Sequence, residues 1–240
     1  MYFHKIGYFI IPVTISALAL CLGSNYTVNT GEGKAMNQSS STPATDVPVM
    51  AHVTLTGKLS RAEDKLVIEY TVKNTGANAV YLWDLLKDYQ GEKEFINHDL
   101  AYVFYENPKT VRVVRAMLQL PFDRDIYMKE DPYVRVVPAA GSAQGRIVLS
   151  TPVAELSPFY PGAEKPEDEK EFDCDTVRLI IGCNEMRPGM VLKKDKVGDE
   201  EVLQIKGGWA PLQLWAETTF KAPVKLRVRQ DPFDRRLPLH

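Results

Sequence analysis

Few residues of this chain combine the type and the spacing that enzyme chemistry requires. His4 lies near the N-terminus and His240 is the last residue, which leaves His52 and His98 for a general-base role. A serine nucleophile usually occupies a strained G-x-S-x-G turn, and the sequence contains no such motif. The glycine-rich segment 141–145 (GSAQG) lacks the lysine and the following helix of a phosphate-binding loop. We therefore expect neither a catalytic residue nor a cofactor.

The acidic run at residues 164–175 (EKPEDEKEFDCD) is the densest group of candidate metal ligands. It holds seven carboxylates and two lysines. Oxygen-rich clusters can bind calcium, but the Asp-x-Asp-x-Asp-Gly spacing of a calcium loop is absent. A charged run that contains proline is typical of a solvated loop. We expect such a loop and no metal site, with a metal ion or a basic partner as the alternative.

Two cysteines, Cys174 and Cys183, lie in the part of the chain that we expect to fold. In an exported protein a disulfide would be the usual expectation. If residues 176–182 form one continuous strand, the two sulfur atoms lie about 30 Å apart, because each strand residue adds about 3.3 Å. A disulfide requires Cα atoms within about 7 Å. We therefore expect two free thiols, unless the strand bends or the cysteines pair between chains.

Residues 1–23 are typical of a bacterial export signal. Lys5 precedes the apolar segment 6–22, which Gly7 and Pro12 interrupt. The alternative is an uncleaved membrane anchor, but a segment of roughly 17 residues with two helix breakers is at the lower limit for spanning a bilayer. We expect export to the periplasm, as a free protein or tethered to the membrane and facing the periplasm.

The signal contains two candidate cleavage sites. Residues 17–19 (ALA) fit the ordinary signal peptidase, whereas residues 18–21 (LALC) resemble a lipobox, in which Cys21 would be lipidated and become the new N-terminus. Leu20 is larger than the Gly, Ala or Ser that a lipobox prefers before the cysteine. Lipidation of Cys21 is therefore the alternative to a soluble or signal-anchored protein.

Composition and charge place the rest of the chain. Residues 24–48 are rich in Asn, Ser, Thr, Gly and Pro without an apolar period, which predicts a disordered tether. Residues 49–230 form one expected domain, and residues 231–240 a C-terminal tail. With 45% hydrophobic and 10% aromatic residues, the chain can build a substantial core. A formal net charge of −2 argues against a nucleic-acid binder.

The segment 65–86 (KLVIEYTVKNTGANAVYLWDLL) predicts the central element of the domain. Its apolar residues Leu66, Ile68, Tyr70 and Val72 alternate with polar ones, as in a strand with one buried face. The turn-forming residues 74–78 and a second β-rich run at 79–83 follow. We therefore expect a hairpin here.

Short β-rich runs separated by turn residues continue to the end of the domain. We expect strands at residues 52–59, 101–105, 111–118, 133–137, 146–149, 176–183, 202–206, 211–219 and 224–229. The segment 84–100 is the one candidate helix or long crossover, because Leu85, Leu86 and Tyr89 have roughly helical spacing. About nine or ten strands with turn chemistry between them predict an all-β, antiparallel sandwich.

Two segments resemble immunoglobulin-like modules of exported bacterial proteins, which include adhesion-type repeats and proteinase-inhibitor-like domains. The run 70–76 (YTVKNTG), with Val80 and Leu82 beyond it, is similar to their V-x-N-x-G hairpin. The runs 136–142 (VVPAAGS) and 145–149 (GRIVL) resemble the entry to a late strand. The resemblance implies an immunoglobulin-like sandwich, and it carries over no catalytic or binding residue.

Arginine and aromatic side chains are the candidates for recognition. The turn at Asn107–Pro108 joins two β-rich runs in which Arg112 and Arg115 interrupt apolar residues, and outward arginines can protect a sheet edge or anchor a partner. Trp209 follows two glycines in an expected loop or bulge. We predict that these three residues contact a partner and that Trp83 and Trp215 pack in the core.

These features predict a non-enzymatic envelope protein that binds another envelope protein or has a structural role. The alternative is a hydrolase, or a domain that regulates one, for example a proteinase inhibitor that uses the proline-containing loop at residues 150–164.

Overall fold

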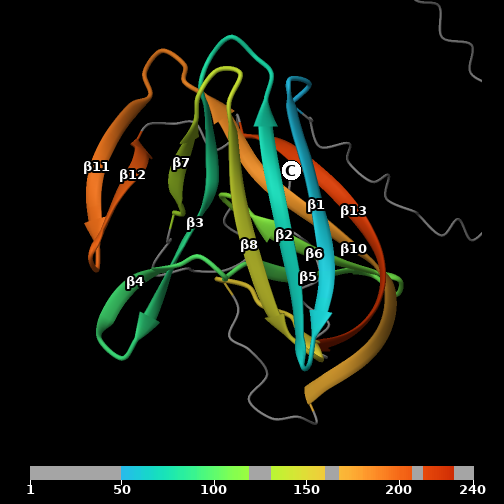
Figure 1. Ribbon diagram of the computed structural model, residues 1–240. Helices are drawn as coiled ribbons and strands as arrows, with labels where there is room; N and C mark the ends of the chain where they lie inside the picture. The colour runs from blue at the N-terminus through green and yellow to red at the C-terminus, as the bar shows by residue number, and fades with distance from the viewer. Residues whose placement is uncertain (1–49, 119–130, 160–167, 207–212, 230–240) are drawn as a thin grey trace, which may run out of the picture. The chain divides into compact units, whose positions relative to one another are not determined.

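The computed structural model describes residues 50–118, 131–159, 168–206 and 213–229, all within the second of two units, residues 1–43 and 44–240. The predicted signal, tether and tail lie outside these residues. The described ranges contain strands and no α-helix, which confirms the all-β class, and none of their elements is a helix that could cross a membrane. The strands, more numerous than expected, are β1 (Val53–Ala62), β2 (Lys65–Asn74), β3 (Val80–Gln90), β4 (Lys93–Asn97), β5 (Tyr102–Asn107), β6 (Thr110–Arg115), β7 (Tyr133–Val137), β8 (Ser142–Ser150), β9 (Val153–Ala154), β10 (Glu169–Glu185), β11 (Val191–Val197), β12 (Glu200–Lys206) and β13 (Leu214–Arg229) (Figure 1).

A three-stranded sheet in the order β1-β2-β8 lies in front of the larger sheet in Figure 1. β2 is its middle strand and is antiparallel to both neighbours. Leu66, Ile68, Tyr70 and Val72 of β2 are buried, and the residues between them are exposed or half-buried, as the alternation predicts.

The larger sheet has the order β11-β12-β7-β3-β10-β13-β9, with β6 and β5 joined to β10. Most of its strand pairs are antiparallel, but β6 runs parallel to β10 and β9 runs parallel to β13. The expectation of purely antiparallel strands is therefore wrong. β6 and β10 are more than 50 residues apart in sequence, so no hairpin turn constrains their relative direction.

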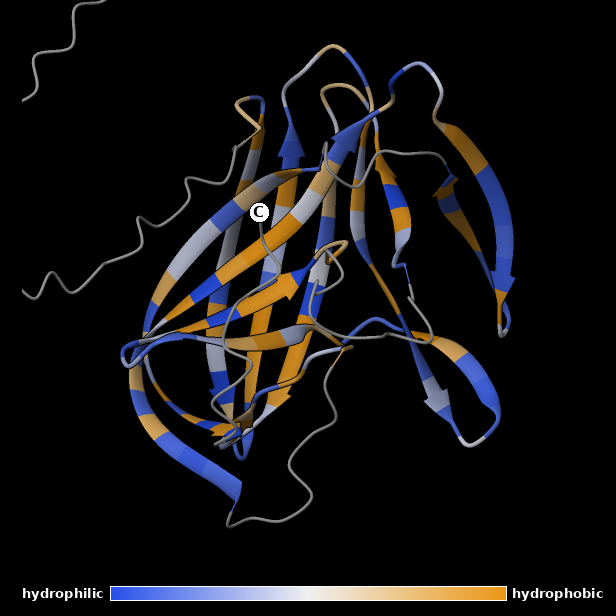
Figure 2. Cartoon of the chain, turned by 180° about the vertical axis from the view of Figure 1, so that it is seen from behind, coloured by the Kyte–Doolittle hydropathy of each residue, from blue (hydrophilic) through white to orange (hydrophobic). Residues whose placement is uncertain are grey.

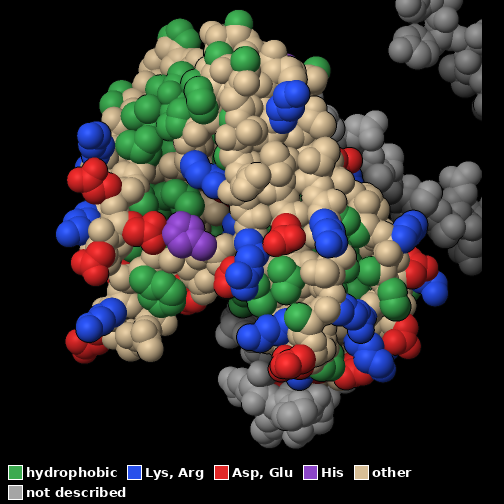
Figure 3. Space-filling view, viewed as in Figure 1, with side chains coloured by type: hydrophobic (Ala, Val, Ile, Leu, Met, Phe, Trp, Pro, Cys, Tyr) green, Lys and Arg blue, Asp and Glu red, His purple; other side chains and the backbone are tan. Residues whose placement is uncertain are grey.

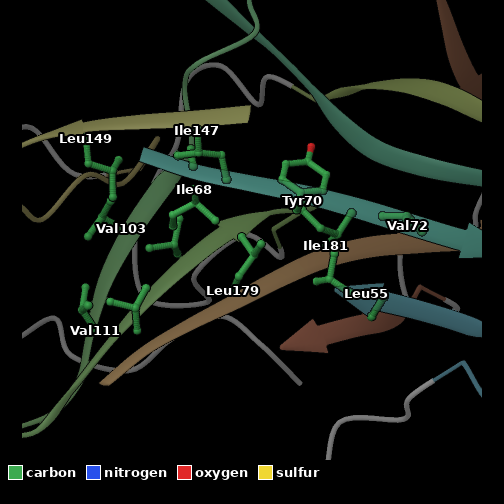
Figure 4. Packing of buried hydrophobic residues seen from close by; sticks show 14 of the residues in the cluster. Leu55, Ile68, Tyr70, Val72, Val103, Val111, Ile147, Leu149, Leu179 and Ile181 are labelled. Carbon is green, nitrogen blue, oxygen red and sulfur yellow. The ribbon is translucent and has the colours of Figure 1, made fainter. Parts of the chain in front are cut away.

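The main core lies between the two sheets. Figure 4 shows Ile68, Tyr70 and Val72 facing Leu179 and Ile181 of β10 across this core. Each fully buried Leu, Ile or Val side chain contributes about 1.5–3 kcal/mol relative to an exposed one. Trp83 is completely buried and Trp215 is 6% exposed, so the prediction that both pack in the core is confirmed.

The connection from β2 to β3 passes from one sheet to the other, so the hairpin expected at residues 65–86 is wrong. Asn74 forms the corner: its Nδ2 donates to the carbonyl oxygens of Asn78 (2.7 Å), Val137 (3.3 Å) and Pro138 (3.1 Å), and its Oδ1 accepts from Gly76 N (2.9 Å). Val137 ends β7 and Pro138 begins the connection to β8, which also changes sheets. One buried amide thus ties the two crossovers together.

The segment 84–100 forms strands, and the helix expected there is wrong. β3 continues to Gln90 and pairs with β4 through a turn at Gly91, whose φ of +65° suits glycine. The side chains of Asn97 and Asp88 are joined by a hydrogen bond of 2.8 Å across the pair. Cross-strand pairing therefore overrides the helical spacing of three apolar residues.

Part of the acidic run is a strand and not the expected loop. β10 begins at Glu169 and pairs with the basic end of β13. Figure 2 shows that the first part of β10 is hydrophilic. Arg227 Nη1 lies 3.3 Å from Glu169 Oε2, and Lys225 Nζ lies 3.6 Å from Glu171 Oε2. β13 is also continuous where two strands were expected, and residues 164–167 lie outside the described ranges.

Cys174 and Cys183 are both buried in β10 and both are free thiols, which confirms the expectation from strand length. Burial raises the pKa of the Cys183 thiol to about 12. Burial, together with the charges of Asp175 and Asp173, also raises the pKa of Cys174, so both thiols are held in the protonated form.

A short segment after β8 joins two edges of the larger sheet. Val153 and Ala154 pair with Leu226 and Arg227 of β13, and Leu156 exchanges two backbone hydrogen bonds of 2.9 Å with Val103 of β5. Residues 153–156 therefore pair with backbone N–H and C=O groups at the edges of β13 and β5 that would otherwise face solvent.

Candidate functional site

A groove of about 650 Å³ crosses the three-stranded sheet. Two rows of side chains border it, and the strand register aligns each row across β1, β2 and β8. One row is Thr56, Thr71 and Gln144, and the other is Lys58, Glu69 and Arg146. Figure 3 shows this side of the molecule, where separate Lys and Arg side chains stand among uncharged polar groups and backbone.

Backbone forms the floor of the groove, because the row between the two borders is Gly57, Tyr70 and Gly145. The Tyr70 side chain points away from the groove and is 2% exposed. A Cβ atom at position 145 would lie 2.2 Å from Tyr70 Cζ, so only glycine fits beside this ring. The glycine and the tyrosine therefore set the shape of the floor together.

A buried polar cluster supports the floor from the core side. The Tyr70 hydroxyl donates to Asp84 Oδ2 (3.0 Å) and accepts from Arg115 Nη1 (2.9 Å). Arg135 forms an ion pair with the same Asp84 oxygen. Burial, together with the Asp84 carboxylate, raises the pKa of Tyr70 well above its ordinary value. The hydroxyl therefore stays protonated and links β2 to β3 and β6.

Arg115 also closes the free edge of β8. Its guanidinium donates to Arg146 O of β8 (2.9 Å), and to Leu100 O (2.7 Å) and His98 O (2.6 Å) of the segment before β5. Arg135 donates in the same way to Gln144 O of β8. Two arginines thus donate hydrogen bonds to carbonyl groups on the edge of β8, where another strand could otherwise pair.

The expectation that Arg115 projects outward is wrong, because its side chain points inward and the residue is 2% exposed. Val111, Val113 and Arg115 share one face of β6, and both valines are fully buried. The two-residue period could have identified the inward arginine. A lone charged residue in an apolar run does not reveal, however, that its guanidinium donates hydrogen bonds to a buried tyrosine and three carbonyl groups.

Arg112 lies on the other face of β6 and pairs within the chain. Its Nε donates to Glu106 Oε2 (3.2 Å), and Arg178 Nη1 lies 3.0 Å from Glu106 Oε1. Burial alone would raise the pKa of Glu106, but the hydrogen bond and charge of Arg112 and the charge of Arg178 hold it below its ordinary value. Contact of Arg112 with a partner stays a prediction, and Trp209 and Cys21 lie outside the described residues.

The groove offers hydroxyl, amide and charged groups to a ligand, and the outer face of the three strands is positively charged. Four exposed basic residues of the strands, Lys58, Lys65, Lys73 and Arg146, stand against one exposed acid of the strands, Glu69, and Asp99, whose Oδ1 lies 3.5 Å from Arg146 Nε. Among the described residues, no three His, Cys, Asp or Glu side chains are close enough together to hold a metal ion. This arrangement suits recognition of a polar chain by hydrogen bonds and charge.

Comparisons of the chain with protein-family models, with curated proteins and with solved structures find no match.

Proposed function

We propose that the chain is an exported, non-enzymatic protein of the bacterial cell envelope, built as an immunoglobulin-like sandwich, that binds another envelope protein through the groove across β1, β2 and β8. The observation that carries this proposal is the pair of aligned polar rows. The floor between them is supported from the core side by the hydrogen bonds of the Tyr70 hydroxyl to Asp84 and Arg115. A rigid surface loses little conformational entropy when a partner binds.

Export supports the choice of partner. The sequence pattern of residues 1–23 and the polar segment 24–48 fit a domain that stands in the periplasm or is tethered to a membrane and faces the periplasm. Partners encountered there are envelope proteins.

The proteinase-inhibitor alternative depends on a free extended loop at residues 150–164. Residues 153–156 of that loop pair with β13 on one side and β5 on the other. The described part of the loop is therefore engaged within the domain, which favours the groove as the binding surface.

The variant Thr71→Trp tests the groove. Thr71 is half-buried in the polar row and points away from the core, so the indole would fill the groove without disturbing the fold. We expect the amount of partner captured from a solubilised envelope extract, measured by quantitative mass spectrometry, to fall about tenfold or more, which corresponds to about 1.4 kcal/mol of binding energy.

Thr219→Trp is the matched control, because Thr219 is exposed on β13 in the other sheet. It should capture the partner as well as the wild type does. Equal capture by the wild type and by Thr71→Trp would refute the groove as the binding surface.

A further inference from the structure

We propose that β11 is a docking edge to which an acidic strand of a partner protein adds, extending the larger sheet by one strand. This surface is separate from the groove. β11 is the terminal strand of the sheet, and all seven of its residues pair with β12 on the other side. In Figures 1 and 2 no described strand lies beyond it.

The register identifies the backbone groups that face outward. β11 and β12 are joined by the two-residue turn Gly198–Asp199, so the flanking Val197 and Glu200 form a hydrogen-bonded pair. Bonded and non-bonded pairs alternate in an antiparallel ladder. The N–H and C=O groups of Leu192, Lys194 and Lys196 therefore point away from β12, where a partner strand can bind them.

Three other edges of the described sheets, those of β8, β13 and β5, are occupied by the chain itself. Arg115 and Arg135 satisfy carbonyl groups of β8, and residues 153–156 bind the edges of β13 and β5. Among the described residues no such contact is made with the outer edge of β11. Among the described strands, β11 combines such an outer edge with three exposed lysines.

Charge selects the kind of strand that fits. Lys193, Lys194 and Lys196 of β11 are exposed, and Asp195 is the one acidic residue of the strand. Pairing of β11 with β11 of a second copy would bring these lysines together, and like charges on adjacent strands are destabilising. An acidic strand instead places carboxylates beside the lysines, and Val191, which is 61% exposed, offers one apolar contact at the start of the strand.

The hairpin is held in place before any partner arrives. Gly198 has a φ of +57°, the left-handed geometry that two-residue hairpin turns favour. Val197 and Val202 pack in a buried cluster with Ile96 and Tyr133. Glu200 also contacts His98, with His98 Nε2 2.9 Å from Glu200 Oε1. A preorganised edge binds more tightly, because the hairpin loses little conformational entropy when the partner strand adds.

The test uses a fluorescent nine-residue peptide of alternating glutamate and valine, with a lysine–valine peptide of the same length as its counterpart. Fluorescence anisotropy, measured as the folded protein is added, should show binding of the acidic peptide and no binding of the lysine–valine peptide. Its affinity should fall at high salt, because the contacts between exposed charges are screened. Equal binding of both peptides would overturn the proposal.

Two variants at one position separate backbone pairing from simple attraction between charges. Lys194→Pro removes an outward N–H, which an edge strand tolerates, whereas Lys194→Ala removes only the charge. We expect Lys194→Pro to lose binding and Lys194→Ala to weaken it by less than about tenfold. Thermal melting checks that both variants are folded. If the proline and alanine variants bind equally well, no strand adds at β11.

The groove variant Thr71→Trp should leave peptide binding unchanged, so failure of the edge proposal and failure of the groove proposal are distinguishable. If Thr71→Trp abolishes peptide binding, the peptide occupies the groove and the proposal for β11 is wrong.

Discussion

Arg115 joins several parts of this domain through its side chain. It reaches from β6 to the hydroxyl of Tyr70 and to carbonyl groups of residues 98, 100 and 146. A buried guanidinium is costly unless its donors are satisfied, and here donors on all three of its nitrogen atoms have acceptors. The arginine therefore fixes the distance between the two sheets at the point where the groove crosses the outer one.

Replacement of Arg115 by methionine should destabilise the domain by about 3 kcal/mol or more, because several buried acceptors lose their donor together. Arg112→Met is the matched control. It removes an arginine on the opposite face of β6, but Glu106 keeps Arg178 as a partner, so the expected loss is about 1 kcal/mol. Urea unfolding measures both, and equal losses would contradict the role assigned to Arg115.

Glu106 should make stability depend on pH in the acid range. Its pKa in the folded protein lies below the ordinary value of 4.5, so its contribution is fully present above that value and is lost as the pH falls through the lowered pKa. The difference in unfolding free energy between the wild type and Glu106→Gln should therefore shrink between pH 7 and pH 3. A difference that stays constant over this range would show that the ion pairs contribute nothing.

At the scale of the elements, the alternation of residue types was enough to predict which faces of the strands are buried. The inward residues of β2 follow the two-residue period, whereas the central part of β10, residues 179–184, is buried without interruption because it lies in the middle of the larger sheet. The pairing of the strands was not predictable in this way, because a turn sequence such as residues 74–78 suits both a hairpin and a corner between sheets. The deciding factor is the tertiary position of Asn74, whose amide donates to acceptors 63 and 64 residues further along the chain.

Asn74→Ala should cost about 2 kcal/mol, because it removes hydrogen bonds in a buried corner and leaves carbonyl groups of the second crossover without a donor. Asn78→Ala is the control. Asn78 contributes only its backbone carbonyl to the corner, and its side chain is exposed. Thermal melting should separate the two variants clearly. If both melt at the same temperature, Asn74 does not hold the two crossovers together.

The candidate sites differ in the same way in how far the sequence predicts them. The polar rows of the groove lie on the exposed faces that the alternation predicts, but their alignment depends on the register of three strands from two distant parts of the chain. β11 was missed altogether because its four charged residues, three lysines and Asp195, outnumber its three apolar ones. Its strand conformation is imposed by β12 and by the buried valines at its turn.

At the scale of the whole molecule, the predicted lipidation of Cys21 can be tested directly. If Cys21 is lipidated, wild-type cells grown with labelled palmitate should show label on the protein, and Cys21→Ser should lose the label and release the domain to the soluble periplasmic fraction. Cys174→Ser is the control, since that thiol is buried in β10. Unlabelled wild-type protein would leave a soluble or signal-anchored form.

If the chain is exported as proposed, its two buried cysteines limit the time available for folding. During transit the thiols of the unfolded chain would meet enzymes that form disulfides, and a bridge between Cys174 and Cys183 would prevent β10 from forming as one strand of 17 residues. Burial removes that hazard once the domain has folded. Folded protein exposed to an oxidant should keep both thiols, and the urea-unfolded chain should lose them. In an oxidising compartment the domain would then reach its native state only if it folds faster than its thiols are oxidised.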